Sequence, residues 1–182
     1  MQLTFTSALN NADLEPAEDG NSFKLLLAYE DADAANRTLE LLYRIAADIE
    51  GPPQRLLVCA MWKFDFLADP NLSKLAAHEV QRADVILIAG HARPALPAPL
   101  KRWIDTWVWT KTGRPMALAA CLDGAPHGGA GGSLVQLREA ARLAGIDFIA
   151  TGGGDGSEDA IKLGISQAAE QGMRAHRWEC AG

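Results

Sequence analysis

The chain has 182 residues, of which 48% are hydrophobic and 22% are charged, and its formal net charge is −6. This length and composition predict one globular domain with a core of its own and argue against a disordered protein. The negative charge argues against non-specific binding to nucleic acid or to an anionic membrane, since both need clustered Lys and Arg. Without a long apolar run or a basic, apolar leader, the sequence predicts a cytoplasmic protein with no membrane span.

Strands and helices are expected to alternate along most of the chain. Residues 1–22 are polar and unpatterned, and we expect them to form an arm outside the core, although the run LTFT could pair with a sheet edge. The predicted strands are apolar runs of strand length, at 23–29, 55–62, 85–89, 115–122 and 146–151. The predicted helices are amphipathic or carry start and stop signals, at 34–49, 72–82, 100–108, 133–144 and 157–172.

Local signals mark where several of these helices begin or end. Asp33 is the expected N-cap of the first helix, and Asp69 followed by Pro70 is a start signal for the second. Ser133-x-x-Gln136 has the spacing of a capping box, in which each side chain bonds a free backbone N–H of the first turn. Gly145 is the expected stop of that helix.

The stretch Ala83–Val108 is the most informative part of the chain. Its strand is apolar on both faces, which is typical of a parallel sheet covered by helices on both sides. A Gly/Pro-rich loop follows, and Pro97 and Pro99 suit the first turn of the next helix. The buried stripe of that helix is predicted to contain Leu100, Trp103, Ile104, Trp107 and Val108.

Five strands joined by helices predict an α/β fold with a parallel sheet and right-handed crossovers. The count favours five strands in the order 2-1-3-4-5 in a three-layer arrangement. We expect a single domain at 23–172 and a short tail at 173–182.

The stretch ADVILIAGHARPALPAPLKRWIDTWV, at Ala83–Val108, resembles the third strand, flavin loop and following helix of flavodoxin-like NAD(P)H-dependent FMN reductases. The resemblance extends loosely from Lys24 to Thr151 and implies the flavodoxin-like fold. Relatives commonly dimerise, which implies a homodimer to which Trp109 and the loop at Trp62 could contribute.

The resemblance also places the flavin site at loops that follow the strands. It implies that the ring and ribityl chain lie against His91, Ala92, Arg93 and Pro94. It implies a second, glycine-rich contact at Asp123, Gly124, His127 and Gly128. Glycines in such loops allow the backbone to approach a flat ligand closely.

The loop after the first strand carries acids where a flavin phosphate would need N–H groups and small residues. Glu30, Asp31 and Asp33 would repel a dianion, and only Asn36 and Arg37 remain as phosphate partners. The same acids would stabilise the start of a helix. The sequence therefore predicts a weakened or lost phosphate site.

Three functions follow from this sequence. The first is a flavodoxin-like protein of FMN-reductase ancestry that acts as a binding or structural module, with no cofactor and with a small aromatic ligand as a candidate partner. The alternative is an FMN-dependent NAD(P)H oxidoreductase, whose cofactor is FMN. The second alternative is a divalent metal on the acidic rim, with candidate ligands Glu30, Asp31, Asp33, Asp65, His91, Asp123 and His127.

Overall fold

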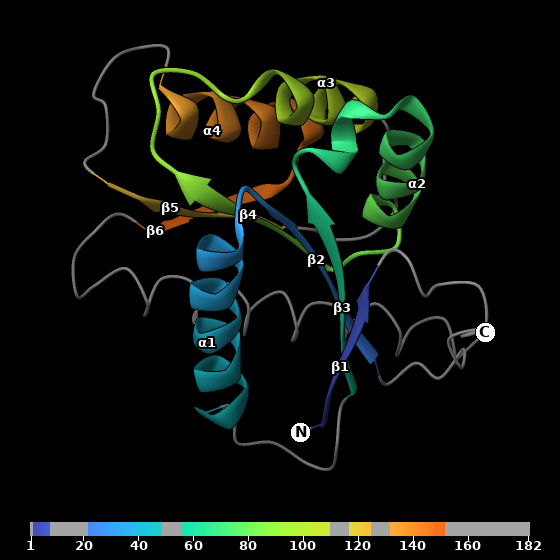
Figure 1. The fold of residues 1–182 in the computed structure, drawn as a ribbon, viewed down its shortest axis with the longest axis vertical. Helices are drawn as coiled ribbons and strands as arrows, with labels where there is room; N and C mark the ends of the chain where they lie inside the picture. Colours follow the sequence, from blue (N-terminus) through green and yellow to red (C-terminus); the bar gives the residue numbers. More distant parts are fainter. Residues whose placement is uncertain (1, 8–21, 49–55, 110–116, 125–131, 152–182) are drawn as a thin grey trace.

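The computed structural model describes residues 2–7, 22–48, 56–109, 117–124 and 132–151. In this part of the chain a parallel sheet lies between helices (Figure 1). The helix predicted at 157–172 and the tail at 173–182 lie outside the described residues, as does most of the N-terminal arm.

Six strands form the sheet, in the order β1-β3-β2-β4-β5-β6, and every neighbouring pair is parallel. They are β1 (Gln2–Ser7), β2 (Ser22–Tyr29), β3 (Leu56–Lys63), β4 (Val85–His91), β5 (Ala117–Asp123) and β6 (Asp147–Thr151). When β2 to β6 are numbered 1 to 5 in chain order, their order in the sheet is 2-1-3-4-5, so the predicted order is confirmed. β1 adds a sixth strand beside β3, at a sheet edge where the LTFT run was expected to be able to pair.

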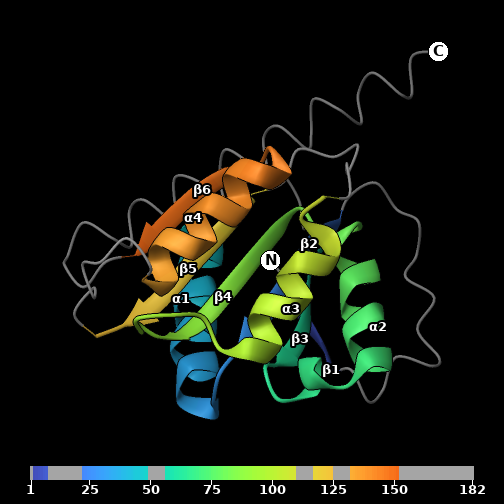
Figure 2. The same cartoon turned by 90° about the horizontal axis from the view of Figure 1, so that it is seen from above.

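Helices cover both faces of the sheet. They are α1 (Ala32–Asp48), α2 (Pro70–Val80), α3 (Ala98–Trp107) and α4 (Ser133–Ala144), together with a short 3-10 helix, η1 (Phe66–Ala68). Figures 1 and 2 show α2, α3 and α4 on one face and α1 on the other. None of the helices in the described ranges is both long and apolar enough to cross a membrane.

The core has two layers because successive residues of each strand point to opposite faces. In β4, Ile86 and Ile88 pack with the residues of α2, α3 and α4. Val85, Leu87 and Ala89 pack on the other side, with the apolar residues of α1. Residues 85–90 are all buried, as the apolar run predicted.

The predicted helix stripe of α3 is confirmed. Leu100, Trp103, Ile104, Trp107 and Val108 are each no more than 3% exposed. Pro97 is the N-cap and a proline follows in the first turn, as expected for residues whose missing N–H costs nothing there.

Two predicted helix-capping residues are wrong. Asp33 lies inside the first turn of α1, and the side chain that accepts a first-turn N–H belongs to Asp31. The capping box at Ser133 is also absent, because Gly132 is the N-cap of α4 and no side chain caps it. The start at Asp69 is confirmed, since its carboxylate accepts two first-turn N–H groups. Gly145 ends α4 with φ of +69°, as predicted.

Candidate functional site

The candidate site lies where the strand order reverses. From β2 the chain first adds β3 on one side and then β4 on the other. Ligands of open α/β sheets bind outside the carboxyl ends of the strands at such a switch point. The first residues beyond β2 are Glu30 and Asp31, and β4 ends at His91, so these residues flank the place where a ligand would bind.

Glu30 reaches across this point from β2 to β4. Its Oε2 accepts the backbone N–H of His91 at 3.0 Å, and its Oε1 pairs with the guanidinium of Arg93. The side chain is only 18% exposed. Gly90 leaves room for it, because a Cβ at position 90 would lie 2.8 Å from Glu30 Oε2.

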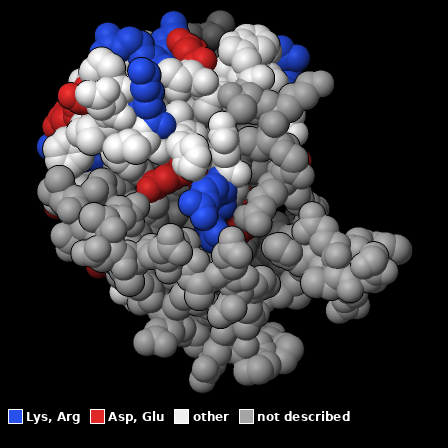
Figure 3. Space-filling model, turned by 90° about the vertical axis from the view of Figure 1, so that its right-hand side faces the viewer, with Lys and Arg blue, Asp and Glu red and all other residues white. Residues whose placement is uncertain are grey.

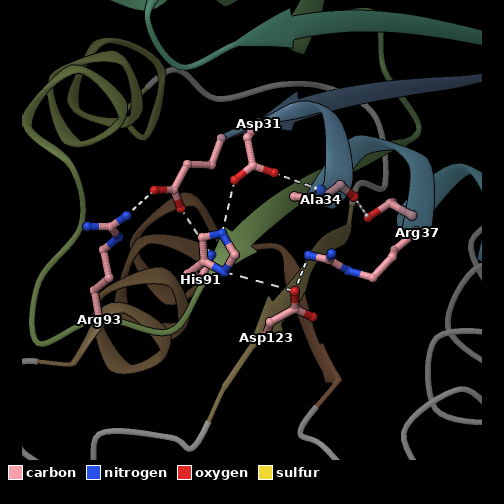
Figure 4. Close-up of polar contacts among 8 residues, drawn as sticks. Asp31, Ala34, Arg37, His91, Arg93 and Asp123 are labelled. Atoms are coloured by element: carbon pink, nitrogen blue, oxygen red, sulfur yellow. Dashed lines mark hydrogen bonds and ion pairs between the residues drawn. The ribbon is translucent and has the colours of Figure 1, made fainter.

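Asp31 joins the first turn of α1 to the end of β4. Its Oδ1 accepts the Ala34 N–H at 2.8 Å, and its Oδ2 lies 3.0 Å from His91 Nε2 (Figure 4). The Ala34 N–H, and after it the His91 ring, lower the pKa of Asp31 from its ordinary value of 3.8. The carboxylate is therefore ionised at neutral pH and can only accept, so the proton of this hydrogen bond is on His91 Nε2.

Asp123, at the end of β5, connects the site to a third strand. Its Oδ2 pairs with Arg37 of α1 and lies 4.0 Å from His91 Nδ1 (Figure 4). His91 thus lies between two carboxylates that come from opposite sides of its strand. The side chains of Asp31, His91 and Asp123 are each between 43% and 46% exposed, so water reaches this network.

The loop after β4 uses its backbone donors within the protein. Ala92 N–H bonds Asp123 O at 2.7 Å, and Arg93 N–H bonds the Oγ of Ser133 at 3.1 Å. Leu96 N–H bonds Oε1 of Gln136 at 3.2 Å. The two side chains expected to form a capping box on α4 instead hold this loop, which is why α4 has no side-chain cap.

The described residues at the carboxyl ends of β2, β4 and β5, with the start of α1, form the rim of the site, and positive and negative side chains alternate along it. Three carboxylates, of Glu30, Asp31 and Asp123, face two guanidinium groups, of Arg37 and Arg93. Charges of both signs also lie side by side on the face in Figure 3, without a broad field of one sign among the residues drawn in colour. The rim is therefore an ion-paired surface with excess negative charge when His91 is neutral.

The structure brings together four of the residues predicted for the site, and places the others nearby or outside the described part. Arg37, His91, Arg93 and Asp123 form one network. Asn36 is exposed on α1, Ala92 and Pro94 follow β4, and Gly124 follows β5 with φ of +92°. His127 and Gly128 lie outside the described residues.

Sequence reasoning named three residues of this site without predicting the roles that the structure gives them. Glu30 was expected to repel a ligand but not to fill the space beside Gly90, and the long-range roles of Ser133 and Gln136 were not foreseen. The available signal was the glycine at the end of β4, because a glycine there indicates a close approach by another group.

Among the described residues, the rim has no metal site, and Trp62 and Trp109 differ in exposure. Across the described ranges, no group of three or more His, Cys, Asp or Glu is arranged to hold a metal ion. The Trp62 side chain is buried and does not contact a flavin ring at the rim, because it is 3% exposed and its Nε1–H donates to Glu79 at 2.7 Å. Trp109 is 70% exposed, and a homodimer that uses it stays a prediction.

Comparisons with known proteins bear on the fold. No protein-family model and no curated protein matches this chain. An oxidoreductase from Corynebacterium diphtheriae superposes with a TM-score of 0.51 at 13% identity, over 84% of this chain and 95% of that chain. The fold is flavodoxin-like. An FMN-dependent NADH-azoreductase from Bacillus anthracis, solved in complex with FMN, has a TM-score of 0.46 at 11% identity, over 85% of this chain and 99% of that chain.

Proposed function

We propose that this protein is a flavodoxin-like binding module in which the position of a flavin phosphate is closed by the protein's own carboxylates. The observation that carries the proposal is the hydrogen bond from Ala34 N–H to Asp31 at the start of α1. A helix N-terminus at a switch point is where a phosphate binds, because free N–H groups and the helix dipole attract an anion. A carboxylate at this place competes with the phosphate for the same donors and repels it.

The cations of the rim support the same conclusion. Arg37 is paired with Asp123, and Arg93 is paired with Glu30. A phosphate dianion that recruited either guanidinium would leave a carboxylate of the rim without that partner. The cost is larger for Glu30, whose side chain is only 18% exposed, because a largely buried charge without its partner costs more than an ordinary hydrogen bond contributes.

The loop after β4 offers little to the polar edge of a flavin ring. The N–H groups of His91, Ala92, Arg93 and Leu96 are all bonded within the protein, and Pro94 has none. A planar ligand at this loop would be recognised by the side chains of His91 and Arg93, which are 43% and 49% exposed. The proposed module therefore selects its ligand by side-chain contacts with a charged rim.

The alternative function is an FMN-dependent NAD(P)H oxidoreductase, and the similarity to the fold of the diphtheria-bacillus oxidoreductase favours it. In that case Asn36 and Arg37 would hold the phosphate after Arg37 leaves Asp123. Residues 91–94, with those at 123, 124, 127 and 128, would hold the ring. FMN would supply the hydride chemistry, and the protein would orient it.

Titration with FMN and with riboflavin, which lacks the phosphate, separates the two functions. In the doubly substituted protein Glu30→Ser, Asp31→Ser, we expect FMN affinity to rise above that of the wild type, while riboflavin affinity changes little. Asp65→Ser is the matched control, because Asp65 is an exposed acid of the next loop that pairs with Lys63. FMN affinity that is unchanged or lower in the double variant would contradict the proposal.

A further inference from the structure

The carboxylate of Glu30 packs against Gly90 at the end of β4, and we call the groups that surround it the carboxylate seat. The seat consists of Gly90, the backbone N–H of His91 and the guanidinium of Arg93. We propose that the seat is a carboxylate-binding site, which Glu30 fills in the resting protein and which takes the carboxylate of a small ligand when Glu30 leaves. The inference rests on the proposed function, because it names the ligand class of the same rim.

The donors of the seat match the two oxygens of one carboxylate. His91 N–H approaches Oε2 of Glu30 at 3.0 Å, and Arg93 pairs with Oε1. A guanidinium is always charged and presents fixed N–H groups to a planar anion, and a backbone N–H adds direction. The seat therefore recognises a carboxylate by charge and by geometry.

The shape of the seat depends on the missing side chain at position 90. A Cβ there would lie 2.8 Å from Oε2 and 3.1 Å from Cβ of Glu30, closer than packed atoms allow. The carboxylate lies directly over the backbone, and its side chain is only 18% exposed.

The backbone of the seat is fixed by contacts that do not involve Glu30, whereas the Arg93 guanidinium pairs with Glu30 itself. Arg93 N–H bonds Ser133 Oγ at 3.1 Å, and Ser133 N–H bonds the Arg93 carbonyl at 2.9 Å. His91 is fixed by β4–β5 pairing and by its bond to Asp31. The backbone of the seat, with the His91 N–H, is therefore expected to keep its position when Glu30 is removed, and a donor that is already in place loses little entropy on binding.

Chemical rescue with sodium acetate tests the proposal. Glu30→Ala removes a CH₂–COO⁻ group, which has the size and charge of acetate. We expect acetate to raise the melting temperature of Glu30→Ala above its value in sodium chloride of equal ionic strength. The wild type and Glu30→Gln should not respond, because a side chain fills the seat. Glu30→Ser vacates the seat in the same way and provides a second variant.

Two controls separate the seat from a general effect of anions. Glu139→Ala leaves Arg142 without its exposed ion-pair partner but creates no seat, so it should not respond to acetate. Arg93→Gln added to Glu30→Ala should weaken acetate binding about tenfold or more, as expected for a hydrogen bond to a charged group. Equal melting temperatures of Glu30→Ala and Glu30→Ser in acetate and in chloride, or an equal response of Glu139→Ala, would overturn the proposal. FMN binding by the wild type would instead contradict the proposed function.

Discussion

At the scale of single residues, His91 is the centre of the rim. Its backbone N–H holds Glu30, and its ring lies between Asp31 and Asp123. A single residue of β4 thus connects groups from the ends of β2 and β5. Its partner Asp31 has two roles, because it also accepts the Ala34 N–H at the start of α1.

The lowered pKa of Asp31 predicts how stability depends on pH. The ionised carboxylate stabilises the fold above its ordinary pKa of 3.8, and this contribution is lost as the pH falls through the lowered value. Asp31→Asn keeps a helix-capping side chain but removes the charge. We expect the melting temperature of Asp31→Asn to lie below that of the wild type at neutral pH, and the two to converge in acid, as the pH falls through the lowered pKa of Asp31. A difference that stays constant over this range would contradict the assigned ionic role of Asp31.

The residues of the rim were predictable from sequence, but their pairing was not. The loops after the strands were placed at one edge by the rule for parallel sheets, and Arg37, His91, Arg93 and Asp123 do lie together there. Which acid meets which base depends on strand register. Tyr29 pairs with Ala89 and His91 with Asp123 in the sheet, and a hydrophobic pattern does not specify such contacts between distant segments.

At the scale of secondary-structure elements, α4 shows how tertiary contacts can replace a local capping motif. Ser133 and Gln136 have the spacing of a capping box, yet Ser133 Oγ and Gln136 Oε1 accept N–H groups of the loop after β4. Without these two side chains, the part-buried N–H groups of Arg93 and Leu96 would lose their acceptors. The N-cap of α4 is instead Gly132, and the helix begins at Ser133.

This exchange of partners predicts the effect of Ser133→Ala. The change removes the acceptor of Arg93 N–H, and we expect a loss of about 1 kcal/mol in the free energy of unfolding. Amide hydrogen exchange should accelerate at Arg93 and not at the first turn of α4. Ser73→Ala, at another buried helical serine, is the matched control and should leave Arg93 exchange unchanged. Faster exchange confined to the first turn of α4 would restore the capping-box interpretation.

The elements themselves followed from periodicity. The strand predicted at 85–89 is found at Val85–His91, and the helix predicted at 34–49 is found at Ala32–Asp48. Pro70 begins α2 and Gly145 ends α4, as predicted, because proline and glycine act through their own backbone geometry. Asp33 failed as an N-cap because Asp31 and Asp33 are both acceptable caps, and the contact with His91 favours Asp31.

At the scale of the whole molecule, the order of strands β2 to β6 was predicted from the alternation of strands and helices together with the strand count. The sixth strand, β1, was foreseen only as a short run able to pair, because LTFT is too short for a pattern to decide between a strand and an arm. The fold places the ends of β2 and β4 side by side. The rim residues then close that position with ion pairs, which no fold-level argument predicts.

The most direct measurement of the central claim is a titration of FMN with the purified wild-type protein, followed by flavin fluorescence and by absorbance near 450 nm, where a flavin cofactor absorbs. The account predicts a colourless protein and no quenching up to about 100 µM protein. A yellow protein, or FMN bound at micromolar concentration with riboflavin bound much more weakly, would contradict it, because the phosphate would then bind beside Asp31.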